Sequence, residues 1–230
     1  MEALAIDGDH NVRAALNLSY ATLPPPTARL YRLLRLHPGR EFDGAVVSAL
    51  SAADRDAAEL LEVLADASLL IDAAGERHRF HDLVRLRAAA KARRDESPQE
   101  RTKAMRRIAD HYLASATRAE GIIDPQHRTM ARDYRAGPVV IADVGPDSEA
   151  ALNRLERELP TLMAVIHQAR SAGFPTVCWQ LADALWPLFL RRKFYDRNPA
   201  LLREGDRTTP VRPSRFSAPR SPPLTPTPTP

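Results

Sequence analysis

The feature that most constrains the fold is a change of sequence period at residues 69–80, LLIDAAGERHRF, in a chain whose other patterns are helical. Two short runs typical of β-strands, residues 69–71 and 77–80, flank the turn sequence DAAGE. Gly75 in this turn can adopt the positive φ that a tight hairpin often needs. The sequence therefore predicts one small β-hairpin set among helices.

Helical patterns lie on both sides of this hairpin. Apolar residues recur at helical spacing before it, and HDLVRLRAAAKARRD after it consists mostly of good helix formers. The helices expected before the hairpin cover residues 12–20, the stretch that starts at Pro26 or Thr27, residues 42–51 and residues 54–70. Several helices followed by a hairpin are the element order of a winged-helix domain, which we assign to residues 11–95.

A second helical part follows this domain. Ser97, Pro98 and Glu100 form the start signal of a connecting helix, which we place at residues 97–121. Residues 122–146 contain repeated glycines and prolines, and we interpret them as a linker.

Two apolar helices separated at Gly173 are expected in residues 147–196, where they would form an αα-hairpin, the first unit of a TPR-like series. Residues 197–230 are rich in Pro and Arg and end in SPPLTPTPTP, a composition that cannot bury a core, so we expect a disordered tail. The predicted fold class is mainly α: a winged-helix domain with one small β-hairpin, a helical TPR-like hairpin and a disordered C-terminal tail.

The distribution of charge weakens the case for nucleic-acid binding. The formal net charge is +4, and residues 197–230 account for all of it. Glu59, Glu62 and Asp66 lie on AAELLEVLADA, the candidate recognition helix, which has no Lys or Arg and would be repelled by DNA phosphates. We therefore do not expect this chain to bind DNA, although basic residues between Arg85 and Arg107 leave a winged-helix DNA-binding regulator as the main alternative.

Other sequence features exclude most further classes. Ser19 has no His and Asp partners at a recognisable spacing, so we expect no catalytic triad and no enzyme activity. His78 and His81 lack a third ligand at metal spacing, so we expect no metal site. His111 is interpreted as an interface or solvent residue, and the single cysteine, Cys178, as part of the core of a cytoplasmic protein. We find no signal peptide and no apolar run long enough to cross a membrane.

His81 and Asp82 stand where the hairpin gives way to the next helix, and two explanations are open. Asp at a helix start commonly accepts hydrogen bonds from backbone N–H groups, which makes capping the simpler explanation. A helix N-terminus also favours anions, and a His ring adds a donor that strengthens on protonation, which points to phosphate binding.

The segments VRAALNLSYATLPPPTARLYRLLRLHPG, LLEVLADASLLIDAAGERHRFHDLVRLRAA and RRIADHYLASA resemble those of NB-ARC (STAND-class) nucleotide-switch proteins. The resemblance is strongest to actinobacterial antibiotic-regulatory proteins, and it covers roughly residues 1–195. It rests on LSY, the HPG step, DASLL and the HDL element, and LERELPTLMAVIHQARSAG resembles the start of the family's TPR-like repeats.

The resemblance implies a role for each part of the chain. Residues 1–10 would be the remnant of a preceding helical subdomain, and the winged helix would close over ADP bound by an ATPase core. His81 would contact the β-phosphate of ADP, and Asp82 would orient the ring or brace the helix start. ADP or ATP is expected only within the full-length architecture, not on this chain alone, and the expected partner is the NB-ARC ATPase core, or another protein bound by the helical region.

The sequence departs from that family in one respect. None of its nine glycines is followed by Lys, so it contains no G-x-x-x-x-G-K-[ST] phosphate-binding loop. We therefore expect a regulatory fragment of a switch protein, or a separate product of a broken gene. The tail after Asn198 fits nothing in the family, and a frameshift or truncation would explain it. A third interpretation is a helical protein-interaction adaptor with no nucleotide role, which would be indifferent to substitution of His81.

Overall fold

The structure is a computed structural model, and it describes residues 14–51, 56–126, 130–135, 137 and 139–192. The predictions for residues 1–10 and for the tail at 197–230 lie outside these residues. Within them the chain is mainly α with a small antiparallel sheet, as the sequence predicts. The described part contains no helix that is long and apolar enough to cross a membrane.

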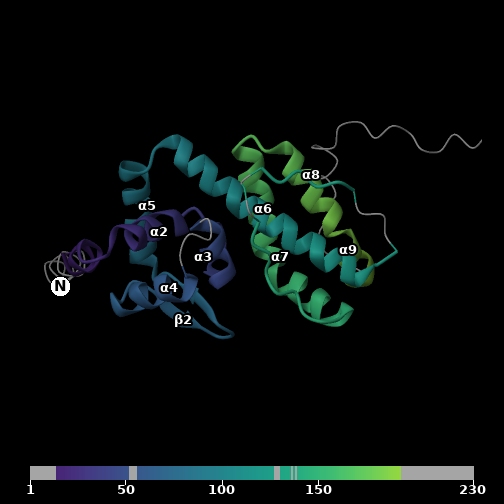
Figure 1. Ribbon diagram of the computed structural model, residues 1–230, viewed down its shortest axis with the longest axis horizontal. Helices are drawn as coiled ribbons and strands as arrows, with labels where there is room; N and C mark the ends of the chain where they lie inside the picture. Colours follow the sequence, from purple (N-terminus) through teal and green to yellow (C-terminus); the bar gives the residue numbers. More distant parts are fainter. Residues whose placement is uncertain (1–13, 52–55, 127–129, 136, 138, 193–230) are drawn as a thin grey trace, which may run out of the picture.

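The N-terminal helices pack around the sheet at one end of the molecule (Figure 1). After a helical segment at residues 14–21, the helices are α2 (Pro25–Leu34), α3 (Gly44–Leu50), α4 (Ala57–Asp66) and α5 (Asp82–Asp95). Their core includes Tyr31, whose hydroxyl donates to the carbonyl of Val84 at 3.0 Å and whose ring meets Phe80 edge-on. This bond joins α2 to the first turn of α5.

The sheet has three strands rather than the two that the sequence predicts. The expected hairpin is formed by β2 (Ile71–Ala73) and β3 (Arg77–Arg79), and Gly75 between them has φ 73°. The additional strand, β1 (Glu41–Phe42), pairs with β3, so that the order is β1-β3-β2. The predicted helix over residues 42–51 is therefore wrong at its start.

Helix α6 (Pro98–Ile123) connects the N-terminal elements to the C-terminal ones and lies at the centre of the molecule (Figure 1). It begins as predicted, because the Ser97 side chain accepts a hydrogen bond from the Glu100 N–H. It packs against α7 (Ser148–Ser171) and α8 (Pro175–Ala184), and α9 (Trp186–Arg192) follows. Pro160 lies inside α7 and does not end it.

Gly173 separates α7 from α8, as the sequence predicts. Its φ is 80°, and the N–H groups of Gly173 and Phe174 donate to the carbonyls of Arg170 and Ala169. This is the Schellman pattern that satisfies the last carbonyls of a helix, and it needs a residue that tolerates positive φ.

The described part of residues 124–147 is irregular, yet it is packed against the helices. Arg132 is almost fully buried and binds Glu120 of α6 at 2.6 Å and Asp183 of α8 at 2.9 Å. His111 is also buried, with its Nδ1 at 2.7 Å from the carbonyl oxygen of Val140. The expectation of a solvent position for His111 is therefore wrong, since the irregular segment covers this face of α6.

Candidate functional site

His81 is the N-cap residue of α5, and its backbone is extended (φ −62°, ψ 149°). Its side chain is exposed and makes no capping hydrogen bond, and exposed Asp82 is the first residue of the helix. Among the described residues, no hydrogen bond links either side chain to the first turn of α5. Of the two explanations for this pair, side-chain capping therefore finds no support in the geometry, although the Asp82 charge still favours the helix start.

Helix α2 packs against α5, and this packing positions the start of α5. At the C-terminal end of α5, Arg32 of α2 binds Glu96 at 2.7 Å. Near the N-terminal end of α5, Arg85 donates to the carbonyl of Pro38 at 3.4 Å. The HPG turn that ends α2 therefore lies beside the first turns of α5. His81 and Asp82 are held on a rigid element next to this turn.

The face of α5 that follows His81 is apolar and exposed. Leu83 is 37% exposed and Leu86 is 67% exposed, and residues three apart lie on one side of a helix. Leu83 and Leu86 therefore expose apolar surface to solvent on the side of α5 that follows His81.

His78 does not join His81 in a site. Its Nδ1 lies 3.0 Å from Asp72 Oδ1, across the β2–β3 pair. Among the described residues, no group of three or more His, Cys, Asp or Glu side chains is placed to hold a metal ion.

A second cluster of functional groups lies where α7 meets the N-terminal elements. Arg154 of α7 donates to Asp43, the N-cap of α3, at 2.8 Å, and Arg77 of β3 donates to Glu158 of α7. Arg77 also lies 3.3 Å from the Glu41 carboxylate. Sequence reasoning misses this cluster, because its members come from four elements and no motif spacing links them.

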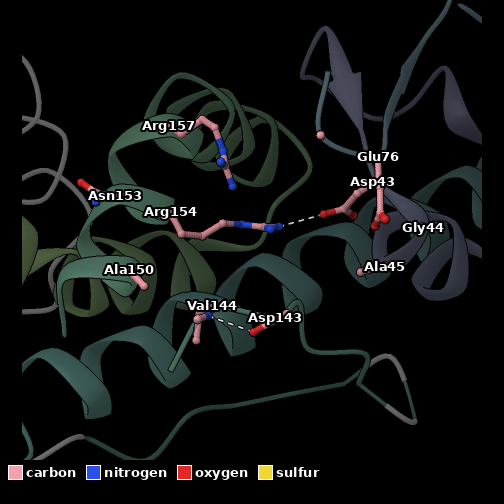
Figure 2. Close-up of a pocket in the computed structure, with 12 residues that line it drawn as sticks. Asp43, Gly44, Ala45, Glu76, Asp143, Val144, Ala150, Asn153, Arg154 and Arg157 are labelled. Carbon is pink, nitrogen blue, oxygen red and sulfur yellow. Dashed lines mark hydrogen bonds and ion pairs between the residues drawn. The ribbon is translucent and has the colours of Figure 1, made fainter. Parts of the chain in front are cut away.

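The Arg154–Asp43 pair borders a cavity of about 520 Å³ (Figure 2). In Figure 2, Arg154 and Arg157 extend from α7 on one side, and Asp43 and Glu76 stand on the opposite side. His81 and Asp82 do not line this cavity. It brings together charges of both signs without a nucleophile and base in contact, so it has the character of a junction between two parts of the chain.

The HPG step, residues 37–39, lies close to this junction. His37 is buried with its Nε2 2.8 Å from the Tyr112 hydroxyl, and burial, followed by the nearby His111, lowers the pKa of His37 to about 3. A Cβ on Gly39 would come within 2.6 Å of the His37 ring and 2.8 Å of the Thr161 hydroxyl on α7. Glycine is therefore required here for a close approach to α7, which explains the HPG step physically.

Comparison with known proteins shows that the chain is similar to part of two curated regulatory proteins. It is 39% identical to the regulatory protein AfsR of Streptomyces griseus over 170 residues. This match spans 73% of this chain and 17% of the relative. It is also 39% identical over 184 residues to the regulatory protein AfsR of Streptomyces coelicolor A3(2), covering 78% of this chain and 18% of the relative. The chain thus spans less than a fifth of the length of these relatives. No family model matches the sequence, and no solved structure matches it.

Proposed function

From the homology of this chain to part of the regulatory proteins AfsR, we propose that it is the winged-helix and helical part of an NB-ARC (STAND-class) nucleotide-switch regulator. The observation that carries this proposal is the state of His81: exposed, unbonded, and held at the uncapped start of α5. The role is regulatory rather than catalytic, and its proposed setting is the cytoplasm.

In the proposed closed state, the winged helix covers ADP held by a P-loop core that this sequence does not contain. The ring N–H of His81 donates to the β-phosphate, and the free N–H groups of the first turn of α5 favour the same charge. The exposed Leu83 and Leu86 pack against the core, which removes their apolar surface from water. Loss of these contacts would open the switch.

The helical part would pass the signal to the winged helix. We propose that α6–α9 begin a TPR-like array, and that Arg154–Asp43 and Arg77–Glu158 couple α7 to the winged helix. A rotation of α7 would break both ion pairs together, since Arg154 and Glu158 lie one turn apart on the same helix.

A protein-interaction adaptor is the second candidate function. Trp186 is 41% exposed and Leu190 is 47% exposed, one turn apart on α9. Such a pair can anchor a partner helix without any nucleotide. The two candidates differ at His81, because an adaptor would tolerate its loss.

The test is the rate of ADP release from a separately expressed P-loop core of the NB-ARC class, measured with a fluorescent ADP analogue. The wild-type chain should slow ADP release. With His81→Ala, release should be at least about ten-fold faster than with the wild-type chain, because a hydrogen bond to a charged group is worth about 1.5–3 kcal/mol. His167→Ala is the matched control, since His167 is exposed on α7 far along the chain from α5. No effect of the wild-type chain on release, or an equal effect of both variants, would refute the proposal.

A further inference from the structure

Three arginines flank the contact between the HPG turn and α5. Arg35 is the C-cap residue of α2, Arg40 follows the same turn, and Arg85 lies one turn into α5 and donates to the Pro38 carbonyl at 3.4 Å. The packing of α2 against α5 places the turn that contains Arg35 and Arg40 beside Arg85, although Arg40 and Arg85 are 45 positions apart in the sequence. Side chains on a helix lean toward its N-terminus, so Arg85 extends toward Asp82 and His81.

These charges are not balanced within the described part of the chain. No ion pair there involves Arg35, Arg40 or Arg85, and the Nε atom of Arg35 is buried without a hydrogen-bond partner. Partial burial, followed by the charges of Arg35 and Arg40, lowers the pKa of Arg85, and the carboxylate of Asp82 opposes this. The charges of Arg35 and Arg40 therefore act unfavourably on that of Arg85, with one nearby carboxylate to offset them.

Folding alone does not require this arrangement. A cation at the C-cap of α2 is favourable because it faces the negative end of the helix dipole, which accounts for Arg35. It does not account for Arg40, which is exposed, and Arg85, although it donates to the Pro38 carbonyl, lies near two like charges. A multivalent anion would remove that cost, and guanidinium groups match phosphate oxygens in pairs.

We propose that Arg35, Arg40 and Arg85 form a diphosphate-binding site beside His81, so that this chain itself grips the phosphates of a nucleoside diphosphate. The inference rests on the proposed function for the identity of the nucleotide, but the site consists only of residues of this chain. The arginines hold both phosphate groups through charge, and His81 contributes a single directed donor. A monophosphate engages fewer of these donors and is held more weakly.

The test is calorimetric titration of inorganic pyrophosphate, ADP, AMP and a 20-base-pair DNA duplex into the purified 230-residue chain. Pyrophosphate and ADP should bind more tightly than AMP, and added salt should weaken their binding. Arg40→Gln and Arg85→Gln should each raise the dissociation constant of pyrophosphate about ten-fold, as expected for one lost charge-assisted hydrogen bond. Arg93→Gln removes the same charge from the far end of α5, where Arg93 is exposed, and should leave binding unchanged.

Three results would overturn the site: no binding of pyrophosphate, equal weakening by Arg93→Gln, or binding of the duplex in preference to pyrophosphate and ADP. Because Arg40 is exposed, Arg40→Gln tests the site even where Arg85→Gln unfolds the chain. The outcome is separate from that of the ADP-release experiment. If the chain binds pyrophosphate but does not slow ADP release from the P-loop core, the site stands and the switch is refuted. If the chain slows ADP release but does not bind pyrophosphate, the switch stands and the site is refuted.

Discussion

Arg154 of α7 donates to the Asp43 carboxylate at 2.8 Å, while the same carboxylate caps α3 by accepting from the Val46 N–H at 3.1 Å. One side chain thus starts a helix of the winged-helix part and binds the helical part. The side chains of Arg154 and Asp43 are each about a fifth exposed, so their ion pair is neither a surface contact nor a fully buried one. It makes the stability of the junction sensitive to one carboxylate.

Asp43→Asn tests this double role, because the amide keeps the cap and loses the charge. Burial raises the pKa of Asp43, but hydrogen bonds from Arg154 and Val46 outweigh it, so the pKa lies below its ordinary value of 3.8. A lowered pKa means that the carboxylate stabilises the fold above pH 3.8 and that this stability is lost as the pH falls through the folded-state pKa. The variant should cost about 1–2 kcal/mol of unfolding free energy at pH 7, measured with urea, and progressively less in acid.

Asp147→Asn is the matched control for this substitution. Asp147 caps α7 by accepting from the Ala150 N–H at 2.8 Å, and no arginine bonds to it among the described residues. A cost at pH 7 equal to that of Asp43→Asn would show that the pair with Arg154 contributes nothing.

The buried His37 predicts a second pH effect with a different window. The folded state holds its pKa at about 3, against an ordinary value of 6.5, so the unfolded chain binds a proton first as the pH falls. Stability due to the neutral ring is complete above pH 6.5 and is lost between pH 6.5 and 3. His37→Gln should flatten the fall in unfolding free energy between pH 7 and 5 by about 2 kcal/mol. Urea unfolding at both pH values measures this, and an unchanged slope would contradict the buried neutral ring.

Gly39→Ala should destabilise the chain by about 1–3 kcal/mol, the usual cost of overpacking. The added Cβ would lie 2.6 Å from the His37 ring and 2.8 Å from Thr161, both of which are held in place by their own helices or turns. Gly44→Ala is the control, because nothing lies within 4 Å of a Cβ there and Gly44 is in a helix. Thermal unfolding should show a lower midpoint for Gly39→Ala alone, and equal midpoints would mean that the turn does not approach α7 closely.

Arg132→Met should be the most damaging single change among these. It removes the arginine that binds the fully buried Glu120 at 2.6 Å, and breaking a buried pair costs about 3–5 kcal/mol. Arg135→Met, which loses an exposed pair with Asp133, should change the unfolding free energy far less, because water screens that pair. Limited proteolysis should then cut near residues 130–135 in Arg132→Met first, and equal resistance of both variants would contradict the packing of this segment.

The parts of the fold that sequence reasoning predicts are those with a strong local signal. The start of α6 at Ser97, the turn at Gly75 and the break at Gly173 each depend on a residue type with a particular backbone or capping role. Strand β1 is missed because two residues cannot show a period. The fourth helix is expected to run to residue 70 but ends at Asp66, since Ser68 adopts a positive φ of 57°, which serine rarely does.

The candidate sites also differ in whether the sequence alone could locate them. His81 can be located from its place at a strand-to-helix junction, and the structure shows that its side chain is exposed and unbonded. The pair formed by Arg154 and Asp43 joins residues 111 positions apart, so only the folded chain reveals it. The same holds for Arg40 and Arg85, whose proximity depends on the packing of α2 and the HPG turn against α5.

The most direct test of the switch is the affinity of this chain for a P-loop core of the NB-ARC class, measured by calorimetry with the core loaded with ADP and then with ATP. We expect at least ten-fold tighter binding to the ADP-loaded core, and loss of that preference in His81→Ala, whose own unfolding free energy should be unchanged because the side chain is exposed. Equal affinity for the two nucleotide states would contradict the account.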